Sequence, residues 1–364
     1  MSGNCPHGDF HAVCRVVDRN SAALRWLWRT DRIVLLDDPK SIRYCYLKLT
    51  YQNMPPIPPQ ESRMEPWSRL ITVLLLTDGQ DFQRTQEQSA QDACDREGFE
   101  IEVAYADNSP AMQMRQVLEY IERPLNLRPA ALAIELASAP AAFTQVAKAT
   151  LAAGVGWVEL SSGASAVELL RHEFPGHLVA SVGVDETAIG ELHAAQCRAL
   201  LPNGGTILYI EGPSVNTIVK ARRLALERGL EGSSITIEKS LAADWTEDGA
   251  AQATIAWLQQ ASSGRVQPAL VCAQNDAMAV GVRKVARARH VGWAGVPVLG
   301  CDGVHTVGQR YVKEGILAAT ITKPATAGPA VDWVVRTLRG QRLPRKVVLS
   351  PASFPSIEEL ARGN

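Results

Sequence analysis

The sequence predicts an α/β fold of two doubly wound parallel-sheet lobes behind an irregular N-terminal leader. From Leu70 onward, β-favouring runs and amphipathic helical runs alternate, as in parallel sheets covered by helices. The alternation restarts after Asp185, which divides it into stretches of about 115 and 140 residues and favours two lobes over one large sheet. In the second stretch, the polar pair of "AQNDAMAVG" (273–281) separates an apolar run from a helical one. Such strand-to-helix edges are where open α/β sheets bind ligands.

The leader, residues 1–66, mixes Trp, Arg and Cys without a sustained period and runs into the proline-rich stretch "MPPIPPQESRMEPW". Proline-rich stretches of this kind are linkers or unstructured joints. Met64 is an alternative start of the protein, a hypothesis that N-terminal sequencing of the native protein tests. The leader also holds "CPHGDFHAVC", whose Cys and His residues suit tetrahedral zinc but are packed more tightly than paired zinc ligands usually are. Incidental placement of these residues is the favoured interpretation: Cys5, His7, His11 and Cys14.

The alternating runs predict the individual strands and helices of each lobe. For the first lobe we expect strands over 70–77, 100–107, 130–137, 156–162 and 177–185, and helices over 83–98, 112–123 and 143–154. For the second lobe we expect strands over 205–212, 233–240, 268–273, 296–302 and 317–323, and helices over 189–202, 216–229, 247–260 and 277–288. A last helix places Val331, Val334, Val335 and Leu338 on one face and stops at Gly340.

Composition excludes several classes of function. The chain of 364 residues is 46% hydrophobic with a net charge of −1, so it lacks the basic surface that nucleic-acid binding requires. No apolar run reaches the roughly 18 residues of a membrane span, and charges interrupt residues 1–35 where an export signal would stand. As written, the chain would stay in the cytoplasm. The seven cysteines form no disulfide framework and fit a reduced compartment.

Motifs for catalysis are missing from the sequence. Neither a phosphate-binding glycine loop nor a nucleophile elbow follows a strand, and no cofactor is predicted. Carboxylates do follow predicted strands, at Glu135, Asp185 and Asp302, and acid–base chemistry would need them at a separation that sequence does not give. The sequence therefore predicts a protein that is not an enzyme.

Four stretches together carry a resemblance to a known family: "AQNDAMAVG", "VLGCDGV" (298–304), "EGILAATITKPATAGPAVDWVVRTLRG" (314–340) and "VDETAIG" (184–190). They resemble the sugar-binding branch of the type I periplasmic binding proteins, with a ribose-binding-protein-like pattern over about Leu70 to Val348. The ligand cores of LacI-type repressors share this fold. The resemblance implies two lobes joined by three crossover strands that close on a sugar, with no catalysis and no metal.

The resemblance also implies lobe boundaries and site residues. Residues 68–184 with 324–345 would form the N-terminal lobe, and 185–323 with the tail 346–364 the C-terminal lobe, with hinges at Asp185 and Gly303. Phe82 matches the aromatic residue that packs on the sugar ring. Asn275 and Asp302 match an amide and a carboxylate that bond ring hydroxyls. In this interpretation Asn275 faces the cleft and Asp276 caps the helix.

Five positions depart from the ribose-binding pattern. Ser161 and Ser162 replace an Asp-Arg pair, Lys220 stands for a cleft arginine, and Lys323 and Glu135 each replace an amide. Two lysines in the cleft favour an anionic group on the ligand, which predicts an acidic or otherwise modified polyol. The alternative is that these side chains point into solvent.

The function expected from the resemblance is the substrate-binding component of an ABC transporter, a monomer that binds a small polar solute, meets a permease and works in the periplasm or cell envelope. A cytoplasmic ligand-sensing protein without a DNA-binding domain is the alternative, since no helix-turn-helix precedes the lobes. An enzyme using the same cleft is a lesser alternative. Nucleic-acid binding and membrane insertion are not expected.

Overall fold

The structure is a computed structural model that describes residues 68–161, 165–214, 216–260, 267–289 and 291–363, together with the backbone of strands β1 (Val13–Val16) and β2 (Arg43–Tyr46). The chain divides into two compact units, Met1–Glu65 and Pro66–Asn364. In the first unit, β1 and β2 pair antiparallel. The side chains considered above for zinc lie outside the described residues: Cys5, His7, His11 and Cys14. All that follows concerns the second unit.

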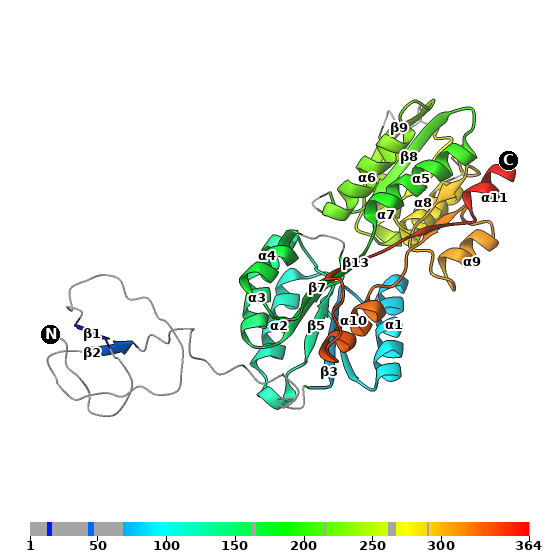
Figure 1. Cartoon of the computed structure of the whole chain (residues 1–364). Coiled ribbons are helices and arrows are strands. Elements are labelled where there is room, and N and C mark those ends of the chain that lie inside the picture. Colours follow the sequence, from blue (N-terminus) through cyan, green and yellow to red (C-terminus); the bar gives the residue numbers. More distant parts are fainter. Residues whose placement is uncertain are drawn as a thin grey trace. The chain divides into compact units, whose positions relative to one another are not determined.

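The N-terminal lobe is built on a six-stranded parallel sheet in the order β13-β7-β6-β5-β3-β4. Its strands are β3 (Leu70–Leu75), β4 (Glu100–Tyr105), β5 (Ala131–Ile134), β6 (Gly156–Glu159), β7 (Val179–Val184) and β13 (Lys346–Leu349). Its helices are α1 (Asp81–Glu97), α2 (Pro110–Glu122), α3 (Pro140–Ala152), α4 (Ser165–Glu173) and α10 (Ala327–Leu338), with a 3-10 turn, η3 (Leu125–Leu127). Helices α1 and α10 lie on one side of the sheet and α2 and α3 on the other (Figure 1).

The two faces of this sheet carry separate cores because successive strand residues point to opposite sides. On β3, Ile71 and Val73 pack with α1 and α10, whereas Leu74 packs with α2 and α3. Burial on both faces explains why the strands read as continuous apolar runs in the sequence.

The C-terminal lobe repeats the arrangement around a four-stranded parallel sheet in the order β11-β10-β8-β9. The strands are β8 (Gly205–Glu211), β9 (Ile235–Ala242), β10 (Leu270–Ala273) and β11 (Val298–Leu299), and β12 (Thr320–Thr322) joins this edge through two single bridges. The covering helices are α5 (Glu186–Leu200), α6 (Thr217–Leu230), α7 (Glu247–Leu258), α8 (Asp276–Ala288) and α9 (Gly308–Lys313). The chain ends with β14 (Ala352–Phe354), antiparallel to β12, and α11 (Ile357–Arg362).

Three segments of the described chain connect the lobes: β7 to α5, β12 to α10, and β13 to β14. A small core lies where they meet, formed by Val184, Ile189, Cys301 and Ile321, with Leu349 packed against it. Apolar packing therefore fixes the positions at which the connecting segments leave the C-terminal lobe.

The predicted two-lobed parallel fold is confirmed, but one boundary was wrong. Residues 346–349 were assigned to the C-terminal lobe, whereas β13 pairs parallel with β7 in the N-terminal sheet. The chain passes to the other lobe only between Leu349 and Ala352. Elements that the alternation did not predict are α4, α9, β13, β14 and α11, all short.

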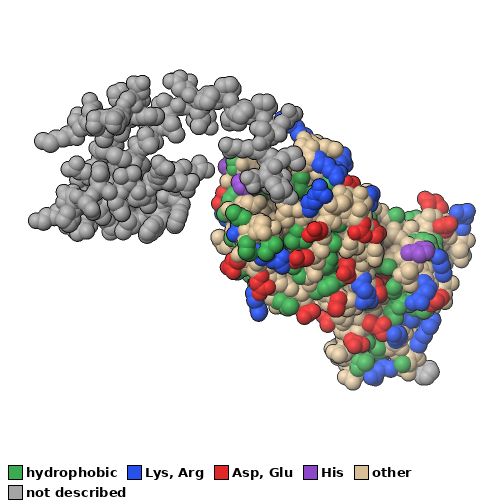
Figure 2. All heavy atoms as spheres, turned by 90° about the horizontal axis from the view of Figure 1, so that it is seen from below, with side chains coloured by type: hydrophobic (Ala, Val, Ile, Leu, Met, Phe, Trp, Pro, Cys, Tyr) green, Lys and Arg blue, Asp and Glu red, His purple; other side chains and the backbone are tan. Residues whose placement is uncertain are grey.

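The surface carries charged side chains of both signs. Acidic and basic side chains are interspersed on the face shown in Figure 2, without one large field of a single sign. Among the described residues, no helix combines the length and apolar character that a membrane span requires.

Candidate ligand-binding site

The candidate site collects side chains that follow the carboxyl ends of strands in both lobes. Phe82 lies in the first turn of α1, which follows β3, and Glu135 comes directly after β5. In the other lobe, Asn275 follows β10 and Asp302 follows β11. Lys323 comes directly after β12, on the segment that returns to the N-terminal lobe.

Lys323 contacts residues of both lobes. Its Nζ lies 3.6 Å from Oδ1 of Asp302 and 3.7 Å from the centroid of the Phe82 ring. The Lys323 side chain is only 13% exposed. A cation over an aromatic face gains about 0.5 to 2 kcal/mol, more as water is excluded. Lys323 therefore joins the N-terminal aromatic ring to the C-terminal carboxylate.

Glu135 is a half-buried carboxylate held by amide side chains. Nε2 of Gln83 donates to its Oε2 at 2.9 Å, and Nε2 of Gln113 donates to its backbone oxygen at 2.8 Å. Burial raises the pKa of Glu135, while the nearby charge of Lys323 opposes that rise. Gln83 thus holds the carboxylate itself, and Gln113 holds the backbone of the same residue.

Asp302 has an unusual backbone conformation for a residue with a side chain. Its φ is 103°, and the strand-like bonds on either side hold it there: its N donates to Ile321 O, and Lys323 N donates to its O, each at 3.1 Å. Such conformations cost on the order of 1 to 3 kcal/mol and cluster at functional sites. Burial raises the pKa of Asp302, and the charges of Lys323 and Arg222 act against this.

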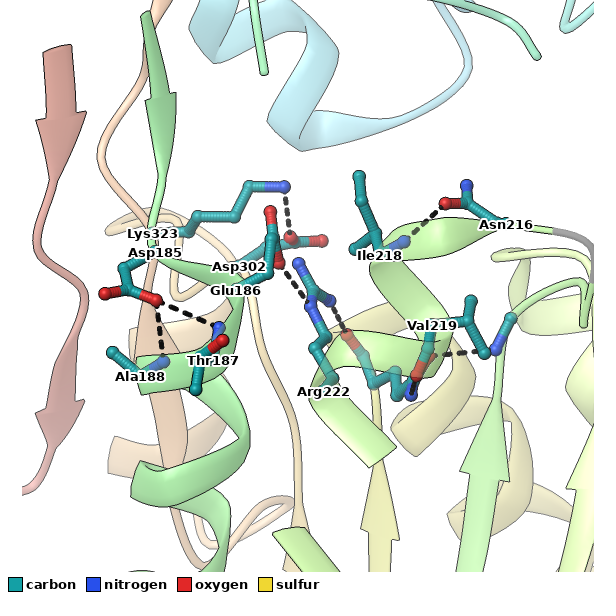
Figure 3. A network of polar contacts seen from close by, with 12 residues as sticks. Asp185, Glu186, Thr187, Ala188, Asn216, Ile218, Val219, Arg222, Asp302 and Lys323 are labelled. Carbon is teal, nitrogen blue, oxygen red and sulfur yellow. Dashed lines mark hydrogen bonds and ion pairs between the residues drawn. The ribbon is translucent and has the colours of Figure 1, made fainter. Parts of the chain in front are cut away.

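Arg222 supplies a buried cation from α6. It is 2% exposed, its Nε lies 2.6 Å from Oε2 of Glu186, and its Nη1 donates to the backbone oxygen of Gln274 at 2.8 Å. In Figure 3, Arg222, Glu186, Asp302 and Lys323 point toward one another. A Cβ at Gly190 of α5 would lie 2.3 Å from Arg222 O, so this glycine lets α5 and α6 approach closely enough to form the pair.

Trp245 is an aromatic residue of the C-terminal lobe that the sequence argument missed. It follows β9 with φ of 72°, lies 5.8 Å from the Arg222 guanidinium, and covers Gly212, where a Cβ would be 2.2 Å from the ring. Its backbone oxygen accepts from Nδ2 of Asn275 at 2.8 Å. The available signal was an aromatic residue just beyond a predicted strand, whereas Phe82 was identified through the family resemblance.

The helix cap expected at Asp276 was wrong, and the ligand contact expected of Asn275 stays a prediction. Asn275 is the residue that caps α8, because its extended backbone lets Oδ1 accept from Met278 N at 2.9 Å. Asp276 is 5% exposed and accepts from Gly303 N at 2.8 Å and from Oγ1 of Thr320 at 2.6 Å. Asp276 therefore fixes the loop that presents Asp302.

The structure does not bring Lys220 into this group. Lys220 is exposed on α6, and two helix positions separate it from Arg222, which is a rotation of about 200°. Arg222 is the cation that this helix directs inward. Ser161 is half-buried beside Glu159, with Oγ 3.5 Å from Oε2 of that carboxylate, and Ser162 lies outside the described residues.

The two expected hinge residues have different roles. Asp185 lies where the chain leaves β7, and its Oδ1 accepts from Thr187 N and Ala188 N at 3.0 Å each, so it caps α5 directly after the crossing. Gly303 was wrongly expected at a crossing, because the chain from β11 through α9 to β12 stays in the C-terminal lobe. Its φ is +55°, and a Cβ there would lie 2.6 Å from Thr322 Cα, so Gly303 packs against the strand that precedes a crossing.

Comparisons with known proteins agree with this architecture. Residues 71–341 match the model of the periplasmic binding protein domain. The ribose import binding protein RbsB of Salmonella typhimurium is 22% identical over 278 residues, which cover 76% of this chain and 87% of RbsB.

Two solved structures share the fold. The Caulobacter myo-inositol binding protein bound to myo-inositol gives a TM-score of 0.68 at 19% identity, covering 82% of this chain and 96% of that one. The second is an ABC transporter periplasmic solute binding protein from Actinobacillus succinogenes with bound D-allose. Its TM-score is 0.67 at 21% identity, and the match covers 80% of this chain and 99% of that one. The chain belongs to the periplasmic binding protein domain family.

Proposed function

We propose that this protein binds a small polyhydroxylated ligand, a sugar or cyclitol, between its lobes and delivers it to the permease of an ABC transporter. The observation that supports this most strongly is the meeting of Phe82 and Glu135 from one lobe with Asp302 from the other around Lys323. A ligand placed there contacts both lobes and the segment that connects them. The related proteins compared above are binding proteins, which fits a role without catalysis.

The side chains suit a polyol. A carboxylate such as Asp302 or Glu135 accepts hydrogen bonds from neighbouring hydroxyls, and the half-buried state of both strengthens such bonds. An aromatic face covers the C–H surface of a sugar or cyclitol ring, for which Phe82 and Trp245 stand on opposite lobes. Asn275 keeps a second N–H on the amide nitrogen that bonds Trp245.

Binding is coupled to closure in this proposal. Side chains of both lobes can contact one ligand together only when the lobes approach each other. A bound ligand therefore favours the closed state. We expect small-angle scattering to show a smaller radius of gyration at saturation with ligand. An unchanged radius for a ligand that binds would contradict closure. Asp302→Asn, examined at a ligand concentration close to the wild-type Kd, is the matched control and should close less than the wild type at that concentration.

The binding role itself is tested by thermal unfolding with a panel of neutral, amino and acidic pentoses, hexoses and cyclitols. A true ligand at about 100 times its Kd adds about 2.7 kcal/mol to the free energy of unfolding. No stabilisation by any member would contradict the proposal. The location of the protein is tested separately, by finding the native protein in cell fractions, and membership of the family leads us to expect the periplasm.

A further inference from the structure

One ammonium group of the chain itself occupies the face of the aromatic ring in the candidate site. Lys323 Nζ lies 3.7 Å from the Phe82 centroid, next to Asp302 at 3.6 Å, and both Phe82 and Lys323 are largely buried. An aromatic face with a carboxylate beside it is the arrangement by which proteins recognise cationic groups. The position over the Phe82 ring and beside Asp302 therefore suits a cationic group.

The charges around this position leave an excess of carboxylate. Arg222 Nε lies 2.6 Å from Oε2 of Glu186, so the charges of these two side chains balance each other. Figure 3 draws this pair beside Asp302 and Lys323. Lys323 then acts on two carboxylates, Glu135 and Asp302. When all five side chains are ionised, their charges sum to −1. A further positive charge would complete the balance, and a negative one would enlarge the imbalance.

Burial favours the neutral forms of the two carboxyl groups, so a cation beside them is needed to keep them ionised. Burial raises the pKa of Glu135 and of Asp302, and Lys323 lowers both. The expectation of an anionic ligand rested on two inward lysines, and Lys220 is not one of them because it lies on the exposed side of α6.

We infer that the ligand is a polyol that carries an amino group, and that its ammonium replaces that of Lys323 over Phe82 between Asp302 and Glu135. This inference rests on the proposed function and narrows the class of ligand. Displacement is feasible because Lys323 stands on a flexible four-carbon stem whose head can move to water. The hydroxyls of the ligand then bond Asp302 and the groups of the C-terminal lobe.

The test is calorimetric binding to the full chain at pH 6.5 with matched series on one ring. Each series has a neutral, an amino and an acidic member: myo-inositol, an aminodeoxyinositol and inositol monophosphate, then glucose, glucosamine and glucuronate, then ribose, an aminodeoxyribose and ribose phosphate. In the series that binds, we expect the amino member to bind at least tenfold more tightly than the neutral one and the acidic member to bind most weakly.

The outcomes separate this inference from the function on which it rests. A neutral or acidic member that binds as tightly as its amino partner overturns the amino inference and leaves the polyol function standing. Failure of every member to bind overturns both. The comparison needs only the wild-type protein, so it does not depend on the folding of any variant.

Variants test the position of the ammonium through the ratio of amino to neutral affinity. Lys323→Met should raise this ratio about tenfold, because the ligand alone then supplies the cation between the carboxylates. Asp302→Asn and Glu135→Gln should each lower it, and Lys220→Met should leave it unchanged. Lys323→Gln repeats the test should Lys323→Met fold poorly. A lower ratio in both Lys323 variants would show that Lys323 helps to bind the ligand and would overturn the inference.

Discussion

In the C-terminal lobe, the side chains of Asn275, Asp276 and Arg222 each make hydrogen bonds to two partners. In the N-terminal lobe, by contrast, Phe82 is buried and has no polar group, and the carboxylate of Glu135 accepts from the amide of Gln83. The C-terminal half of the site is thus tied to the backbone of several loops. Substitutions of Asn275, Asp276 or Arg222 should therefore cost stability. Substitutions at the N-terminal carboxylate should change affinity while the fold persists.

The largest effect is expected from breaking the buried ion pair of α5 and α6. Arg222→Met leaves Glu186 without its partner in a site where that carboxylate is 12% exposed, and should cost about 3 to 5 kcal/mol of unfolding free energy. Arg223→Met is the matched control on the same helix, because its side chain is 36% exposed and should cost less than about 1 kcal/mol. Urea denaturation measures both. Equal losses would remove the contrast between the buried network and the surface.

The next effect is a dependence of stability on pH that arises from His193. Burial, together with the charge of Arg222, lowers the pKa of His193 from 6.5 to about 4, although its bond to the Gly300 carbonyl opposes this. Between these values the unfolded chain binds more protons than the native state, so stability falls as pH drops from about 6.5 to about 4. The loss from this group should reach about 3 kcal/mol.

His193→Gln removes this titration, so the free energy of unfolding of the variant lacks this loss. The difference in unfolding free energy between variant and wild type should therefore narrow as the pH falls through that range. Denaturation at pH 6.5 and at pH 4.5 measures the change. The exposed His172 provides the control, and His172→Gln should follow the wild type at both values. Parallel pH curves for His193→Gln and wild type would show that the native state readily accepts a proton at this imidazole.

A smaller effect, on binding rather than folding, is expected at Asp302. Asp302→Asn keeps the shape and the backbone bonds but loses the charge that faces Lys323, and should cost about 1 to 3 kcal/mol of binding free energy. Calorimetry with a ligand from the panel measures it. Glu135→Gln should change stability by less than about 0.5 kcal/mol, because a half-buried amide there can still accept from Gln83. Normal binding by Asp302→Asn would contradict the proposed site.

The smallest effect compares two helix caps. Asn275→Ala removes the partner of Met278 N and should cost about 1 kcal/mol of stability, and Ser109→Ala removes the similar cap of α2 at Met112 N for a similar cost. Only Asn275→Ala should also weaken ligand binding, since it releases Trp245. Equal binding by the two variants would mean that Asn275 serves only as a cap.

The architecture could be predicted from sequence because buried parallel strands and amphipathic helices leave strong local patterns. For the site, the sequence predicted only that candidate side chains follow the carboxyl ends of strands. Asn275 and Asp276 are adjacent and both suit a helix cap, so their roles depended on backbone angles that composition does not show. Lys220 and Arg222 share one helix, and the choice between them depended on which face α5 covers. The strand β13 is short and partly exposed at a sheet edge, which leaves little pattern to detect.

The three crossings between lobes have a consequence for measurement. An odd number of passages places the two ends of the described region in different lobes, with Leu70 beginning β3 in one and Arg362 ending α11 in the other. Fluorescent labels near these ends would therefore sit on bodies that move relative to each other. Energy transfer between them would follow closure in real time, without a label near the ligand, and could make the chain a biosensor for the molecule it binds.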